Sequence, residues 1–204
     1  MAMVKVKVCG VTRVEDARAA VAAGAAAIGV NFYARSPRCV NVETAQAIIA
    51  TLPASVCGVG VFVNEARARV AEIAERVGLR AVQFHGEESP SDCAGWSLKV
   101  IKALRLRDRE SVSAAAQYPV DFILLDAYVE GHPGGTGRAF TWEWAAACDR
   151  SRLILAGGLT ADNVADAVRA VRPLAVDVAS GVERQPGIKD AELMKRFIAN
   201  AQTA

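Results

Sequence analysis

The chain is poor in the side chains that build metal centres, and its charges nearly cancel. It has two histidines, His85 and His132, so neither a histidine-rich metal site nor a clear Ser-His-Asp triad is visible. Its five cysteines include no C-x-x-C pair, which indicates free thiols in a reducing cytosol. The net charge is +2, and the lysines and arginines are scattered. This pattern gives no indication of a nucleic acid or a membrane surface as a partner.

Long apolar segments are also lacking. No run approaches the ~20 residues needed to span a bilayer. The first five residues contain no long apolar stretch, so we expect no signal peptide. With 52% hydrophobic and 23% charged residues, the 204-residue chain has the balance of a globular protein. No linker or low-complexity tract divides it. We therefore predict one domain, residues 1–204, in the cytoplasm.

Apolar, β-branched runs alternate with segments of helical period along the whole chain. In 45–52, 70–77 and 164–171, apolar residues recur at the three- and four-residue spacing of an amphipathic helix. Segment 88–95 is the weakest predicted helix, with Pro90 in its first turn and Gly95 at its end. The predicted strands are 4–9, 26–32, 56–63, 80–84, 98–104, 121–126, 152–156 and 174–179.

Eight strands, each followed by a helical segment, favour a parallel sheet covered by helices. Units of about 25 residues are compact for a (β/α)8 barrel, which usually has ~250 residues in all. An open, doubly wound sheet is the alternative, but that fold usually has fewer strands. We therefore predict a compact, single-domain (β/α)8 TIM barrel.

Three reactive side chains lie at or near the ends of predicted strands. Asp126 closes an apolar run, Cys9 ends the first predicted strand, and Asp177 lies in the last one. Barrels assemble their active sites at the carboxyl ends of strands, so we predict one shared site. Lys7 lies on the same strand face as Cys9, and its ammonium would favour the thiolate. The structural alternatives are hydrophobic packing of Cys9, and a turn cap or arginine pair for Asp126.

Glycine turns follow the last two predicted strands. Gly157 and Gly158 come after strand seven, and Ser180 and Gly181 come after strand eight. Such turns let backbone N–H groups approach a phosphate, and this is the recurrent phosphate position of barrels. We predict that these four residues bind phosphate.

Other polar loops follow strands two, four and six. Arg38 follows Pro37, and its guanidinium could bind a carboxylate or a phosphate, or simply be exposed. His85 ends strand four and is either structural or part of the site. The loop 131–137 matches neither a P-loop nor G-x-G-x-x-G. We predict a mobile active-site loop there, in which Gly135 contacts the substrate.

Taken together, these segments resemble the phosphoribosylanthranilate isomerase family. The resemblance implies a (β/α)8 barrel and an Amadori rearrangement in tryptophan biosynthesis, without a cofactor. The substrate would be N-(5-phosphoribosyl)anthranilate, and the product 1-(2-carboxyphenylamino)-1-deoxyribulose 5-phosphate. The matching segments occur in family order, at 8–12, 15–17, 36–38, 82–86, 124–126, 134–137, 156–159, 163–164, 180–183 and 187–190.

The resemblance also implies roles for single residues. Asp126 matches the general acid that protonates the ribose ring oxygen, and Cys9 matches the base that removes the proton from C2. Arg38 matches the residue that holds the anthranilate side of the substrate. His85 and Asp177 match polar positions that line the same pocket.

Three positions depart from the family pattern. Phe84 stands where the family more often has leucine, and Asn31 lies in a strand that is usually apolar. Thr141 replaces the aspartate usual before Trp142. None of them is the proposed acid or base.

The same residues leave two other classes of function open. The first class is another barrel enzyme that acts on a sugar phosphate, such as an epimerase or an indoleglycerol-phosphate synthase. An epimerase would need metal ligands, and the synthase would need a catalytic lysine at a strand end. Lys7 and Lys102 are the near candidates for that lysine. A phosphate-ligand binding protein without turnover is the second class. For the isomerase we expect only a phosphorylated sugar–anthranilate as partner, and a monomer or homodimer.

Overall fold

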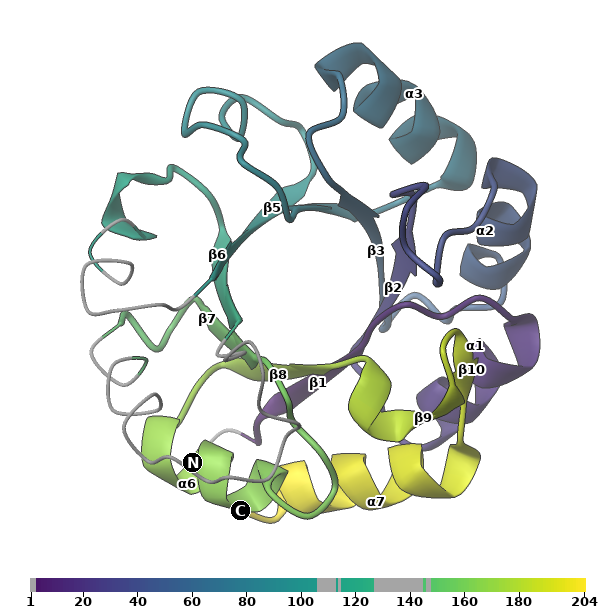
Figure 1. Cartoon of the computed structure of the whole chain (residues 1–204), viewed down its shortest axis with the longest axis vertical. Coiled ribbons are helices and arrows are strands. Elements are labelled where there is room, and N and C mark those ends of the chain that lie inside the picture. The colour runs from purple at the N-terminus through teal and green to yellow at the C-terminus, as the bar shows by residue number, and fades with distance from the viewer. Residues whose placement is uncertain (1–2, 106–112, 114, 127–144, 146–147) are drawn as a thin grey trace.

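The structure is a computed structural model that describes residues 3–105, 113, 115–126, 145 and 148–204. Eight parallel strands close into a barrel in which each strand pairs with its neighbours along the chain, and β8 pairs with β1 (Figure 1). The strands are β1 (Lys5–Val8), β2 (Ala27–Asn31), β3 (Cys57–Phe62), β4 (Ala81–Phe84), β5 (Lys99–Arg105), β6 (Phe122–Asp126), β7 (Leu153–Ala156) and β8 (Ala175–Val178).

All eight predicted strands are present, and the predicted barrel is confirmed. The alternative of an open sheet is wrong, because β1 and β8 pair in parallel with Lys7 opposite Asp177. This register closes the ring and places the first and last strands side by side. The carboxyl ends of strands that are far apart in sequence therefore meet at one rim.

Helices surround the ring of strands (Figure 1). The predicted helical segments are confirmed in α2, α3 and α6, whose apolar stripes are buried against the barrel. The described helices are α1 (Val14–Ala22), α2 (Val42–Ile49), α3 (Arg67–Val77), α6 (Val164–Val171) and α7 (Ala191–Gln202), with the 3-10 helices η1 (Ala115–Gln117) and η2 (Ser180–Val182).

Segment 88–95 is not a helix, so that prediction is wrong. It forms turns, in which Cys93 N–H donates to the carbonyl of Ser89 over 3.2 Å. The hydroxyl of Ser89 donates to the carboxylate of Asp92 over 2.7 Å, a local bond that competes with helical pairing. Trp96 packs on Phe84, with ring centroids 5.4 Å apart, where a helix would otherwise cover the strand.

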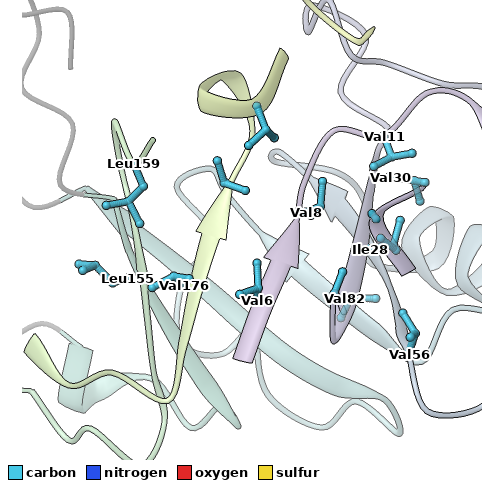
Figure 2. Packing of buried hydrophobic residues seen from close by; sticks show 14 of the residues in the cluster. Val6, Val8, Val11, Ile28, Val30, Val56, Val82, Leu155, Leu159 and Val176 are labelled. Atoms are coloured by element: carbon cyan, nitrogen blue, oxygen red, sulfur yellow. The ribbon is translucent and has the colours of Figure 1, made fainter. Parts of the chain in front are cut away.

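The core has two layers, which follow the alternation of side chains along each strand. Val6 and Val8 of β1 are fully buried in the layer between strands and helices, where Figure 2 shows them near Val176 of β8. Lys7 is buried on the other face of β1. Lys5 shares that face by alternation, but it is exposed at the start of the strand.

The second layer fills the inside of the barrel with small and branched side chains, namely Val59, Ala81, Ile101, Ala103, Leu124, Ile154, Ala156 and Ala175. Above this layer the interior becomes polar, with buried Lys7, Lys102, Gln83 and Asp177. Within the described residues, no helix combines the length and the apolar character needed to cross a membrane.

Candidate active site

A cavity of about 250 Å³ lies at the carboxyl ends of the strands. It brings together every predicted site residue in the described part of the chain. Gly135 lies outside the described residues. The predicted residues that line the cavity are Cys9, Arg38, His85, Asp126, Gly157, Gly158, Asp177, Ser180 and Gly181.

Cys9 directly follows β1, and its backbone N–H donates to the carbonyl of Val178 over 2.8 Å. The residue is 9% exposed and lines the cavity. Room for it comes from Gly29 of β2, because a Cβ at that position would lie 2.9 Å from the Cys9 sulfur. No local pattern around Gly29 indicates this contact, which joins two neighbouring strands.

Lys7 favours the Cys9 thiolate in the expected direction, but burial of the thiol outweighs this effect. Its ammonium donates to the Asp177 carboxylate over 2.7 Å, and both side chains are buried. Burial raises the pKa of the Cys9 thiol, and the Asp177 charge adds to this, while Lys7 acts in the opposite direction. The balance lies above the ordinary value, because the effect of burial is the largest.

Asp126 ends β6 on the opposite side of the barrel mouth, and its side chain is 26% exposed. The Nε2 atom of His85 lies 3.7 Å from its carboxylate. His85 follows β4 and is oriented by Gln83, whose amide nitrogen is 3.0 Å from Nδ1. With the Gln83 amide in this orientation its nitrogen donates and Nδ1 accepts, which places the proton of a neutral ring on Nε2, on the side of Asp126.

Gln83 itself is fully buried inside the barrel, and sequence reasoning missed it. Its carbonyl oxygen has no hydrogen-bond partner among the described residues. Its position two residues before a histidine, in an apolar strand, was the signal that could have identified it. Alternate side chains of a strand share a face, so this spacing predicts that the glutamine contacts the histidine.

Arg38 lies at the mouth of the cavity in an ion pair with Glu183. Its Nε and Nη2 atoms donate to the two carboxylate oxygens over 2.8 and 2.7 Å. Glu183 therefore occupies the Nε–Nη2 edge of the guanidinium. The Nη1 atom takes no part in this ion pair. Asn31 shapes the same loop by donating to the Ser36 hydroxyl over 3.3 Å. Asn31 also lines the cavity, so its departure from an apolar pattern marks a site position.

The glycine turns after β7 and β8 come into close contact. A Cβ at Gly181 would collide with the carbonyl oxygen of Leu159, so only glycine permits this approach of the two turns. Asn163 supports the first turn by donating to the carbonyl of Gly158 over 3.0 Å. The predicted phosphate-binding residues therefore lie in two turns that contact each other on one side of the cavity.

The two lysines considered for a synthase are both engaged in buried ion pairs. Lys7 is paired with Asp177, and Lys102 donates to Glu88 over 2.6 Å and to the carbonyl of Gly86 over 2.7 Å. Among the residues that the structure describes, there is no cluster of three or more His, Cys, Asp or Glu side chains suited to a metal ion.

Comparison with known proteins gives consistent results over the whole barrel. A family model for N-(5'phosphoribosyl)anthranilate (PRA) isomerase matches residues 6–200. An N-(5'-phosphoribosyl)anthranilate isomerase of Pseudomonas fluorescens is 54% identical over 200 residues, which is 97% of this chain and 95% of that protein.

Solved structures agree with this result. The crystal structure of phosphoribosyl anthranilate isomerase from Thermotoga maritima has a TM-score of 0.90 and 41% identity, covering 99% of this chain and 100% of that one. A further crystal structure, of phosphoribosyl anthranilate isomerase in complex with reduced 1-(o-carboxyphenylamino)-1-deoxyribulose 5-phosphate, has a TM-score of 0.86 and 39% identity, and it covers 99% of this chain and 100% of that one. This chain therefore belongs to the N-(5'-phosphoribosyl)anthranilate isomerase family.

Proposed function

We propose that this protein converts N-(5-phosphoribosyl)anthranilate into 1-(2-carboxyphenylamino)-1-deoxyribulose 5-phosphate, a step of tryptophan biosynthesis. Asp126 is the general acid and Cys9 the general base. The observation that carries the proposal is the single cavity that holds this carboxyl and this thiol, on strands β6 and β1, beside two glycine turns. An aldose-to-ketose rearrangement needs one acid and one base, placed around one sugar.

The reaction begins when Asp126 donates a proton to the ring oxygen of the ribose and the ring opens to an iminium. The Cys9 thiolate then removes the proton from C2, which gives an enolamine. Tautomerisation moves a proton from the C2 hydroxyl to C1 and leaves the ketone. After the first step Asp126 is a carboxylate, and the Nε2–H group of His85 is placed to stabilise it.

Binding groups hold the two ends of the substrate around this pair. The turns at Gly157–Gly158 and Ser180–Gly181 supply backbone donors for the phosphate. The Nη1 end of Arg38 is available for the anthranilate carboxylate, while Glu183 fixes the other edge. Fixing both ends places C2 near the thiol and lowers the entropic part of the barrier. We infer a cytoplasmic location for this step. The oligomeric state, monomer or homodimer, stays a prediction.

The direct test is a fluorescence assay of freshly generated phosphoribosylanthranilate. Its fluorescence should decay faster with the protein than in buffer alone, and the product should be the ribulose phosphate. Binding of the substrate without faster decay would favour the alternative of a phosphate-ligand binding protein. A product other than the ribulose phosphate would contradict the proposed reaction.

Replacing Arg38 with alanine should raise KM about ten- to a hundred-fold, because a charge-assisted contact contributes roughly 1.5–3 kcal/mol to binding. The kcat value should change much less, since Arg38 does not transfer a proton. Steady-state kinetics well below the unfolding temperature measures both. Arg35→Ala, in the same loop but exposed, is the matched control. Parental kinetics in Arg38→Ala would remove Arg38 from the site.

Replacing Gly181 with alanine should force the turns after β7 and β8 apart and raise KM about ten-fold, the effect of about one charge-assisted phosphate contact. Competition by inorganic phosphate should weaken in parallel. The same substitution at Gly78, the C-cap of α3 with φ of 73°, strains the backbone far from the cavity. It should lower stability and leave KM as in the parent. A Gly181→Ala variant with parental KM would contradict the phosphate assignment.

A further inference from the structure

A two-stranded hairpin, β9 (Glu183–Gln185) and β10 (Ile188–Lys189), follows η2 and lies beside the mouth of the barrel. Hydrogen bonds connect this hairpin to residues 12 and 16, near the N-terminus. The Thr12 hydroxyl donates to the carbonyl of Gly187 over 2.6 Å, and the Lys189 N–H donates to Asp16 over 3.1 Å. The hairpin therefore has a fixed position relative to the loop after β1, which contains Cys9.

The Lys189 side chain points inward from this hairpin and is completely buried. Its ammonium donates to the carbonyl of Cys9 over 2.6 Å, to the carbonyl of Ala179 over 3.1 Å and to Glu183 over 2.8 Å. These contacts use all three hydrogens of the ammonium. One side chain thus joins the ends of β1 and β8, the first supplying the base and the second leading into the phosphate turn.

Glu183 extends this network to the substrate-binding side of the cavity. Its two oxygens accept from Nε and Nη2 of Arg38, and Oε1 also accepts from Lys189 and from the N–H of Gly187 over 3.2 Å. Its side chain is 4% exposed, so this carboxylate is almost fully desolvated between two cations. The positions of Arg38 and of the Cys9 backbone are therefore coupled through two buried side chains.

Lys189 also contributes to the electrostatic environment of the thiol. The charged groups that act on Cys9 are Lys7 and Asp177 from the barrel interior, Lys189 from β10 and Arg38 from the loop after β2. Burial raises the pKa of the thiol, whereas the Lys189 charge lowers it. Lys7 lowers this pKa more strongly than Lys189 does, and the Asp177 charge opposes both, so Lys189 adds a smaller contribution of the same sign from β10.

We propose that Lys189 is a positioning residue for the isomerisation, whose buried ammonium fixes the Cys9 backbone, the phosphate turn and, through Glu183, the guanidinium of Arg38. The inference rests on the proposed function, in which Cys9 is the base. Lys189 does not touch the reacting atoms. It acts by holding three separate parts of the site in one arrangement and by favouring the thiolate.

The test uses Lys189→Met, which keeps an unbranched side chain one atom shorter and removes its charge. The kcat value should fall roughly ten- to a hundred-fold, since small misplacements of reacting groups have effects of this size. Alkylation of Cys9 by iodoacetamide should also slow at each pH, by about ten-fold for each unit by which the thiol pKa rises. Mass spectrometry of the tryptic peptide 8–13, which contains Cys9 and no other cysteine, follows this thiol alone.

Glu183→Gln is the second variant and should act differently. It removes the anion and keeps both cations, so Cys9 alkylation should be at least as fast as in the parent. KM should rise, because Arg38 loses its charged bidentate partner. Lys195→Met, the same substitution at an exposed position of α7, is the control and should match the parent in every readout.

The outcomes separate the two proposals. If the parent protein does not isomerise phosphoribosylanthranilate, the proposed function is wrong. The alkylation rates would still show whether Lys189 acts on Cys9. Parental kcat and parental alkylation in Lys189→Met would overturn the inference. Slower alkylation in both variants would overturn it too, since it indicates a general disturbance of the rim. If Lys189→Met does not fold, Glu183→Gln becomes the test. Parental KM and kcat in that variant would contradict a role for the Lys189–Glu183 contacts in positioning the site.

Discussion

Replacing Asp126 with asparagine should lower kcat about 10²- to 10⁴-fold, the usual contribution of a general acid. The substitution preserves the shape of the side chain and an oxygen that can accept from the Nε2–H group of His85. It removes the acidic proton that opens the ribose ring. KM should remain within a few-fold of the parental value, since the phosphate turns and Arg38 are unaltered. Stopped-flow or steady-state fluorescence of phosphoribosylanthranilate decay measures both quantities.

The matched control for this prediction is Asp121→Asn, immediately before the other end of the same strand. Asp121 pairs with Lys99 and accepts from the N–H of Val100, so its loss should lower stability slightly. It lies at the amino end of β6, away from the cavity, so kcat should equal that of the parent. A parental kcat in Asp126→Asn would assign the acid to another group, for which His85 is the nearest candidate.

Much of the fold follows from local pattern, because each strand of a parallel barrel is buried on both faces and each helix on one. The run 122–125 and the spacing in 164–171 are of this kind, and both elements form where predicted. The helix predicted for 88–95 does not form, because the side chains of Ser89 and Asp92 form a hydrogen bond with each other. Trp96, which follows this segment in sequence, packs on Phe84 of β4 and covers the strand in place of a helix.

The candidate site was predictable where chemistry coincides with a strand end, as for Cys9 and Asp126. It was not predictable where the function of a side chain depends on a distant partner. The ammonium of Lys189 and the carbonyl of Cys9 are 180 positions apart in sequence, and neither residue shows this contact in its local pattern. Lys7 illustrates the same limit: its neighbour Cys9 suggested activation of a thiol, but its ion-pair partner is Asp177, across the β1–β8 seam.

Replacing Cys9 with alanine should lower kcat as strongly as Asp126→Asn, by about 10²- to 10⁴-fold, because the base that removes the C2 proton is lost. Alanine leaves the backbone bond to Val178 in place, so substrate affinity should persist. The variant should still bind the substrate, which equilibrium titration can measure separately from turnover. Cys57→Ala, at the amino end of β3, is the matched control, and it should retain the parental kcat.

The pH dependence provides an independent check on the same thiol. Burial raises the pKa of Cys9, so the thiolate is the minor form near neutral pH and its fraction grows as the pH rises. In the parent, alkylation of the peptide 8–13 should therefore continue to accelerate with pH into the alkaline range. The thiolate-dependent limb of kcat/KM should rise over the same interval, and the residual activity of Cys9→Ala should lack it. A rising limb of kcat/KM that persists unchanged in Cys9→Ala would mean that the thiolate is not the base. The proton at C2 would then have to be taken by another group in the cavity.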